Sequence, residues 1–237
     1  MNIILFDASE TSQLLPMADP RARHILEVLR REPGDSFDAG LIDGPRCRAT
    51  LVSIDEAGLR MSFVPGEMPA PLMPITLIVG LPRPQTARKL LEEATTLGVE
   101  ALHFVACERG ESSYRQSRLW ATDEWRRHVI AGAEQAFSTL LPEVSFDLSL
   151  GGAVRALGPG YCKIALDNYE AASALGSMRV EPPVVLALGP ERGWSAAERS
   201  LLRSHGFEMA HLGERVLRVE TACVAALSLV RAQLGLS

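Results

Sequence analysis

The chain has 237 residues, of which 47% are hydrophobic and 22% charged, and its formal net charge is −5. This length and composition fit a globular protein of one large or two modest domains, and the negative balance excludes a general basic field for nucleic acid, so that any RNA binding must use local patches. The four cysteines, Cys47, Cys107, Cys162 and Cys223, lie far apart without a C-x-x-C pair, which argues against a metal site and against a disulfide framework.

The first residues, Met1–Asp7, predict neither a signal peptide nor a membrane anchor. The apolar run is too short for a signal peptide and has no basic start. No other apolar run approaches the length of a membrane span. Because the isolated thiols are best explained as small buried groups in a reducing compartment, we expect a cytoplasmic protein.

Short strands and one helix are predicted ahead of residue 65. The helix is expected over Arg21–Arg31, with Ile25, Val28 and Leu29 on one face. Turn signals that contain glycine separate the strands. The strands are expected at Leu41–Ile42, Thr50–Ile54 and Leu59–Val64. This arrangement favours a small β-barrel with one helix.

A linker is predicted where prolines cluster. Pro65, Pro69, Pro71 and Pro74 fall within ten residues, with Gly66 among them. Such spacing blocks both a helix and a central strand. The sequence therefore predicts two domains, residues 1–70 and residues 71–237.

After the linker, strands and helices alternate along the chain. Strands are expected at Ile75–Val79, Leu102–Ala106, Lys163–Leu166 and Val184–Leu188. Helices are expected at Ala87–Leu97, Asp123–Phe137, Ala196–Ser204 and from Glu220 to about Leu234. Thr122 is a candidate N-cap for the second of these helices. The alternation predicts an α/β domain whose mostly parallel sheet is covered on both faces.

Two glycine turns lie near the end of the chain, one in Leu186–Ser195 and one in Leu212–Thr221. In each, an apolar strand leads into a glycine turn and then into a helix. Ser195 and Glu198 have the spacing of a capping box at the first of these helices. Taken alone, the first turn fits an ordinary connection and a ligand-binding loop equally well. The dinucleotide pattern G-x-G-x-x-G is absent near the chain start, which argues against an N-terminal Rossmann domain.

The second turn places charges next to apolar residues. Arg215 and Arg218 flank Val216 and Leu217, which we expect to be buried, and Glu220 follows. Charges at such a boundary need partners. A ligand is one possible partner, and a mutual ion pair between Arg218 and Glu220 is the other.

Read together, the two turns resemble a known family. The pattern G-P-E-x-G-[FW], a helix, G-F and then L-G-x-R-[VI]-L-R-x-E-T-A is similar to that of the 16S ribosomal RNA uridine-N3 methyltransferase family of the SPOUT superfamily. Here it reads Gly189–Trp194, Gly206-Phe207 and Leu212–Ala222. Weaker matches extend the resemblance over nearly the whole chain. They are His24-Ile25, Val28–Arg30, Gly34-Asp35, Asp43-Gly44, Leu97–Val99, Glu108-Arg109 and Glu134-Gln135.

The resemblance implies a homodimer whose protomers have two domains. The N-terminal domain would be a PUA-like β-barrel that binds RNA, and the C-terminal domain a SPOUT domain with a trefoil knot, a feature that no periodicity argument proposes. The loops of the knot would bind S-adenosylmethionine, largely through backbone groups. The cofactor-binding residues carried over are Leu188, Gly189, Pro190, Glu191, Gly193, Leu212, Gly213, Val216, Leu217 and Arg218.

Two residues are candidates for catalysis. Methylation of uridine N3 requires loss of a weakly acidic proton and stabilisation of the negative charge that remains. Arg218 is expected to stabilise charge on the uracil carbonyl oxygens, and Glu220 to accept the proton directly or through water. The alternative for Glu220 is that it holds Arg218 or caps the last helix. Because the methyl donor is an activated sulfonium, no metal is expected.

RNA contacts are expected to use phosphates. The candidate residues are Arg21, Arg23, His24, Arg30 and Arg215. A solvated helix face is the alternative explanation for those on the N-terminal helix.

The chain departs from the common family pattern at Arg192, at Glu92-Glu93 and after Gln135, where Phe137 stands among the residues that follow. These departures leave the exact RNA target open. Other SPOUT activities, such as ribose 2′-O methylation of tRNA or rRNA, and a non-catalytic RNA-binding role remain alternatives.

Overall fold

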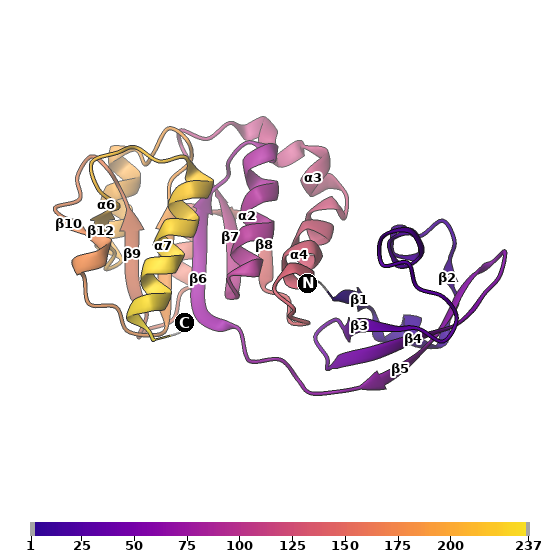
Figure 1. Ribbon diagram of the computed structural model, residues 1–237. Helices are drawn as coiled ribbons and strands as arrows, with labels where there is room; N and C mark the ends of the chain where they lie inside the picture. Colours follow the sequence, from indigo (N-terminus) through magenta and orange to yellow (C-terminus); the bar gives the residue numbers. More distant parts are fainter. Residues whose placement is uncertain (1–2, 236–237) are drawn as a thin grey trace. The chain divides into compact units, whose positions relative to one another are not determined.

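The computed structural model describes residues 3–235, so the first two residues of Met1–Asp7 lie outside it. The chain forms two compact units (Figure 1). The first unit runs to Pro71 and includes Ala133–Leu141, and the second consists of Leu72–Gly132 and the chain from Pro142 onward. The boundary between Pro71 of the first unit and Leu72 of the second therefore lies within the predicted proline-rich linker. The return of Ala133–Leu141 to the first unit was not predicted.

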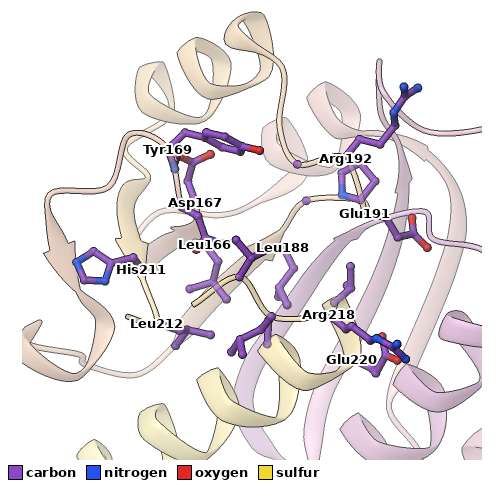
Figure 2. A pocket seen from close by; sticks show the side chains of 18 of the residues that line it. Leu166, Asp167, Tyr169, Leu188, Glu191, Arg192, His211, Leu212, Arg218 and Glu220 are labelled. Atoms are coloured by element: carbon purple, nitrogen blue, oxygen red, sulfur yellow. Dashed lines mark hydrogen bonds between the residues drawn. The ribbon is translucent and has the colours of Figure 1, made fainter. Parts of the chain in front are cut away.

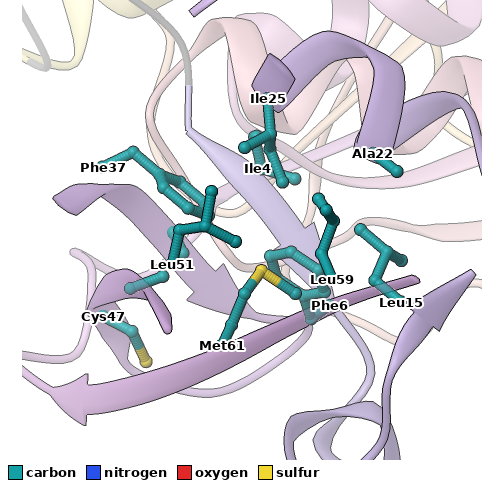
Figure 3. Packing of buried hydrophobic residues seen from close by; sticks show 12 residues of the cluster. Ile4, Phe6, Leu15, Ala22, Ile25, Phe37, Cys47, Leu51, Leu59 and Met61 are labelled. Atoms are coloured by element: carbon teal, nitrogen blue, oxygen red, sulfur yellow. The ribbon is translucent and has the colours of Figure 1, made fainter. Parts of the chain in front are cut away.

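The first unit contains a five-stranded sheet with the order β1-β3-β4-β5-β2. Its strands are β1 (Ile4–Phe6), β2 (Leu15–Pro16), β3 (Ser36–Leu41), β4 (Arg46–Ile54) and β5 (Gly58–Pro65). Strand β1 is parallel to β3, and the other pairs are antiparallel. The core contains Phe6, Phe37 and Leu51, together with Ile25 from the helical segment (Figure 3).

The returning segment joins this unit through hydrogen bonds that involve both its side chains and its backbone. The Leu5 amide donates to the Glu134 carboxylate at 3.0 Å, and the Asp43 amide donates to the Thr139 carbonyl at 2.8 Å. Thr139 is completely buried. These bonds join residues far apart in the sequence, so no local sequence pattern could predict them.

The helix expected over Arg21–Arg31 is shorter and less regular than predicted. Helix α1 (Pro20–Arg23) leads into a π-helical turn, η2 (His24–Val28), in which the Leu29 amide bonds to the His24 carbonyl at 2.9 Å. Because a π turn holds more residues than an α turn, it moves Val28 off the face that contains Ile25. Ile25 is fully buried as expected, but Val28 is 65% exposed, so its predicted place on the apolar face is wrong.

The second unit contains a seven-stranded parallel sheet with the order β10-β12-β9-β11-β6-β7-β8. Its strands are β6 (Met73–Gly80), β7 (Val99–Ala106), β8 (Glu143–Ser149), β9 (Cys162–Leu166), β10 (Ser173–Ala174), β11 (Val184–Leu188) and β12 (Glu208–His211). Every residue of β11 is buried, which requires helices on both faces of the sheet. The predicted α/β class and parallel sheet are confirmed.

The remaining helices follow β6 along the chain. They are α2 (Pro84–Thr96), α3 (Arg118–Ala121), α4 (Glu124–Gln135), α5 (Leu150–Ala156), α6 (Ala196–Ser204) and α7 (Val219–Gln233), with the 3-10 turns η3 (Ser112–Gln116) and η4 (Leu175–Ser177). Helix α2 packs against α7, and α5 packs against α6. Helix α6 has the predicted bounds, and both halves of its capping box are formed by Ser195 and Glu198.

The strand order fixes where a ligand can enter the second unit. From β6 the chain passes to its neighbour β7, whereas from the adjacent β11 it passes in the opposite direction to β12, beyond β9. Adjacent parallel strands whose connections leave in opposite directions open a crevice at their carboxyl ends. In residues 3–235, no helix has the length and apolar character needed to cross a membrane.

Candidate functional site

A cavity of about 670 Å³ lies at the carboxyl ends of the central strands (Figure 2). It is lined by residues 166–169 at the end of β9, residues 188–193 at the end of β11, and residues 211–214, 216–220 and 222 from the end of β12 into α7, with Arg83 and Thr86 at the start of α2. This volume lies in the range of small-molecule sites. The cavity therefore lies where the strand order predicts a ligand site.

The first turn closes tightly after β11. The Gly193 amide donates to the Pro190 carbonyl at 2.7 Å, and Gly193 has a φ of +67°. A residue with a side chain rarely adopts this backbone conformation, so glycine is required here. The turn leaves the backbone of Gly189–Gly193 along the cavity wall.

Two residues that follow the turn hold it to neighbouring loops. The indole of Trp194, which is completely buried, donates to the Leu166 carbonyl at 3.1 Å. The carboxylate of Glu198 accepts from the Ser195 amide at 2.7 Å and from the Glu108 amide at 2.8 Å. The first turn is thus tied to the end of β9 and to the loop that follows β7.

The loop after β9 is a part of the site that the sequence reasoning missed. Asp167 is almost fully buried, and its carboxylate accepts from Arg199 at 2.7 Å and from the amides of Tyr169 and Glu170 at 2.8 and 2.7 Å. The Tyr169 ring is 77% exposed and packs on the Arg199 guanidinium at 5.2 Å. Its position in the sequence could have identified Asp167 as a site residue, because it directly follows the predicted strand that ends at Leu166.

The second turn differs in part from the expectation. Gly213 has a φ of +108°, and its amide donates to Nδ1 of His211 at 3.1 Å. Val216 was expected to be buried but is 83% exposed, and Leu217 is half-buried. The reason is that residues 213–218 form an irregular loop at the cavity, so Val216 covers no part of the core.

Glu220 forms its ion pair with Lys89 of α2, at 3.4 Å, whereas Arg218 is the exposed N-cap residue of α7. Within residues 3–235 no ion pair joins Arg218 to Glu220, so the mutual ion pair considered as an alternative from the sequence is absent from this site. Burial would raise the pKa of Glu220, but its own backbone amide and Lys89 donate hydrogen bonds to the carboxylate. Their effect prevails, and the pKa of Glu220 is lowered.

The cavity brings together the residues predicted for cofactor binding and catalysis. Those that line it are Leu188, Gly189, Pro190, Glu191, Gly193, Leu212, Gly213, Val216, Leu217, Arg218 and Glu220. Arg215 belongs to the same loop and is exposed. In Figure 2 the side chain of Arg192 points away from the cavity.

The N-terminal candidates for RNA contact have different environments. All five N–H groups of the Arg21 guanidinium are engaged, since it donates to Glu10, Asp19 and the Leu5 carbonyl. Hydrogen bonds from Arg21 lower the pKa of Glu10, and in Asp19 they outweigh the opposite effect of burial. Arg21 therefore has no donor left for a phosphate and is better explained as a structural residue.

The other candidates of the first unit remain open to solvent. Arg23 and Arg30 are exposed, and His24 is half-buried. Arg30 has a φ of +52° at the end of the helical segment. These three residues keep the accessibility that a phosphate contact needs.

Comparisons with known proteins agree on one family. A family model for an RNA methyltransferase domain matches residues 68–231. The chain is 35% identical to ribosomal RNA small subunit methyltransferase E of Treponema pallidum, over 98% of this chain and 91% of that protein. It is 31% identical to the protein of the same name from Synechocystis, over 89% of this chain and 70% of that protein.

Solved structures resemble the whole chain. A ribosomal RNA small subunit methyltransferase E from Neisseria gonorrhoeae, bound to S-adenosyl methionine, has a TM-score of 0.79 at 25% identity and covers 99% of this chain and 98% of its own. A methyltransferase from Legionella pneumophila in complex with the same cofactor has a TM-score of 0.78 at 25% identity, with 98% of each chain covered. The sequence and structural matches establish that this chain belongs to the RNA methyltransferase family of ribosomal RNA small subunit methyltransferase E.

Proposed function

We propose that the chain is an S-adenosylmethionine-dependent methyltransferase that modifies N3 of a uridine, uridine 1498, in 16S rRNA of the small ribosomal subunit. The observation that carries the proposal is the cavity at the carboxyl ends of the parallel strands. Its walls are the two glycine turns that carry the family pattern, and the family match covers the same segments.

The cavity fits S-adenosylmethionine in size and in chemistry. The two turns present backbone groups to the cavity at Gly193 and Gly213, where positive φ angles favour glycine and no side chain lies in the way. Leu188 and Leu212 add apolar surface suited to an adenine ring. When bound, the cofactor supplies a methyl group on a sulfonium, so the protein has to supply orientation and electrostatics.

Arg218 and Glu220 are the residues proposed to act on the uracil. Arg218 is exposed at the cavity and lacks an ion pair within residues 3–235, which leaves its guanidinium available to stabilise negative charge on a uracil carbonyl oxygen. Glu220 has a lowered pKa and is therefore ionised at neutral pH. Because its pKa is lowered, the carboxylate holds a proton only weakly, so a proton that it accepts from N3 passes on to water.

Residues 1–70, which make up most of the first unit, are proposed to be a PUA-like RNA-binding barrel, and residues 71–237 a SPOUT domain. Arg23, His24 and Arg30 are the candidate phosphate contacts of the barrel, and Arg215 is the candidate beside the cavity. The trefoil knot, the homodimer and a cytoplasmic location belong to the same proposal, and they rest on the resemblance of the sequence to the SPOUT family. No metal is required, because the sulfonium is already activated.

Where the chain departs from the family pattern, the side chains contact residues outside the cavity or point away from it. Glu92 pairs with His128 at 2.6 Å, and the ring of Phe137 contacts the Arg46 guanidinium at 5.4 Å from its centroid. Arg192 directs its side chain away from the cavity. We therefore assign none of these side chains to the cofactor.

Nucleoside mass spectrometry of rRNA and tRNA from a deletion strain tests the proposal. The expected result is loss of 3-methyluridine from 16S rRNA and its return when the gene is restored. Loss of a 2′-O-methylated nucleoside instead would favour the other SPOUT activity. Calorimetry tests the non-catalytic alternative, which predicts no binding at submillimolar S-adenosylmethionine.

A further inference from the structure

Arg192 adds a guanidinium to the first turn, which forms part of the cavity wall. The residue lies at the cavity wall, and its side chain is exposed and points away from the cavity (Figure 2). The positive φ of this turn falls on Gly193 and not on Arg192. The turn therefore tolerates the arginine without backbone strain, and its side chain is free to serve a partner outside the cavity.

A second guanidinium is fixed beside this turn. Arg109, in the loop after β7, donates from Nη1 to the Arg192 carbonyl at 3.2 Å. The residue before it, Glu108, has its amide bonded to Glu198 of α6 at 2.8 Å. The Glu108 amide and the Arg109 guanidinium each form one of these hydrogen bonds, so Arg109 is held next to the first turn. Most of its N–H donors remain unused.

Neither guanidinium has an acidic partner in the part of the chain that the structure describes. No ion pair within residues 3–235 involves Arg109 or Arg192, and both are exposed. The adjacent carboxylate of Glu191 accepts from the Arg83 amide at 3.0 Å, which directs it toward the start of α2. In a chain of net charge −5, two neighbouring guanidiniums that form no ion pair within residues 3–235 are suited to an external anion.

We propose that Arg109 and Arg192 form a subsite for a backbone phosphate of the RNA substrate. The inference rests on the proposed function, because a base that enters the cavity leaves its flanking phosphodiesters outside, at the rim. Arginine binds phosphate through paired N–H donors, which a glycine at position 192 does not provide. The subsite adds affinity for RNA and leaves cofactor binding unchanged.

Equilibrium binding to a 16S rRNA transcript across a series of salt concentrations tests the subsite without requiring turnover. For single strands, loss of one phosphate contact reduces the slope of log K against log salt by about 0.7. R192G and R109A are each expected to show this reduction and a several-fold weaker affinity at low salt. R192K keeps the charge and is expected to keep the slope while losing part of the affinity. R179A is the matched control, because Arg179 is also exposed but pairs with Glu181 at 2.6 Å, before the start of β11.

Calorimetry with S-adenosylmethionine on the same variants completes the test. Unchanged cofactor affinity in R192G and R109A, together with the smaller salt slope, supports the subsite. A wild-type slope in both variants overturns it, and so does a parallel loss of cofactor affinity, which would assign Arg192 to the cofactor. If the wild-type chain binds S-adenosylmethionine but no RNA, both the subsite and the proposed function fail. If wild type and R192G bind and methylate RNA equally, only the subsite fails.

Discussion

The indole N–H of Trp194 donates to the carbonyl of Leu166 at 3.1 Å and so joins the turn after β11 to the end of β9. Both segments line the cavity, and Trp194 is completely buried between them and the core. A buried indole N–H without a partner is costly, so this bond fixes the relative placement of the two loops. The side chain of Trp194, although outside the lining, thus contributes to the width of the cavity.

W194F is expected to destabilise the protein and to weaken binding of S-adenosylmethionine. The substitution keeps an aromatic ring but removes the donor, which costs about 1–3 kcal/mol through the unpaired carbonyl and the space left by the larger ring. Urea unfolding measures the first effect, and calorimetry measures the second.

W120F separates the hydrogen bond from the change in ring size. Trp120 is 5% exposed, and its indole nitrogen has no hydrogen-bond partner within the described residues. Its replacement loses volume but no hydrogen bond, so a smaller destabilisation and unchanged cofactor affinity are expected. Equal losses in both variants would show that ring volume, and not the bond to Leu166, explains the result.

D167A is expected to destabilise the second unit by about 3–5 kcal/mol, because it leaves the Arg199 guanidinium buried without its closest carboxylate. The side chains of Asp167 and Arg199 are 1% and 7% exposed, and they meet at 2.7 Å. E170A is the control, since Glu170 is 41% exposed and its pairs are worth less than about 1 kcal/mol. Thermal unfolding of both variants distinguishes them, and similar losses would contradict the assignment of the buried pair.

The elements with strong periodicity were predictable from the sequence. Strand β11 is a continuous apolar run, and helix α6 combines a capping box with an amphipathic pattern, so the predicted bounds of both match the structure. Strand β8 and helix α5 were not predicted. The residues of β8 are only partly buried, and α5 contains Gly151 and Gly152, which weaken a helical pattern.

The parts of the site that are continuous segments of the sequence were predictable, whereas the parts that depend on contacts between distant residues were not. The two glycine turns are continuous segments, so their pattern identified the cavity walls. Lys89 and Asp167 reach the site from other elements, and their roles depend on a pairing with Glu220 and on burial against Arg199. Arg21 shows the converse, because a basic residue that suggested RNA contact is occupied by Glu10 and Asp19.

R218A is expected to reduce methylation by about 100-fold or more, in the range found when one donor to a developing oxyanion is removed. Arg218 is exposed and makes no side-chain cap bond at α7, so little change in stability is expected. R215A, in the same loop, is the control and should affect RNA affinity more than turnover. Single-turnover kinetics at saturating RNA separates the two, and full activity in R218A would remove it from the catalytic role.

K89M is expected to move the acidic limb of the pH–rate profile to higher pH. Burial raises the pKa of Glu220, and hydrogen bonds from its own amide and from Lys89 lower it below the ordinary value of 4.5, so loss of Lys89 raises it again. The ion pair with Lys89 stabilises the folded protein at pH values above the unfolded-state pKa of Glu220, and this stabilisation is lost as the pH falls through the lowered folded-state pKa. K89M should therefore destabilise the protein at neutral pH and progressively less in acid.

The charged groups around Glu220 are Lys89, Arg218 and Glu93, whose own pKa is raised by burial and by the Glu220 charge. E93Q removes that like charge and should move the limb in the opposite direction. K163M, at the other lysine, which donates to the His205 carbonyl, should leave the profile unchanged. An acidic limb that stays in place in both K89M and E93Q would show that ionisation of Glu220 does not govern the reaction.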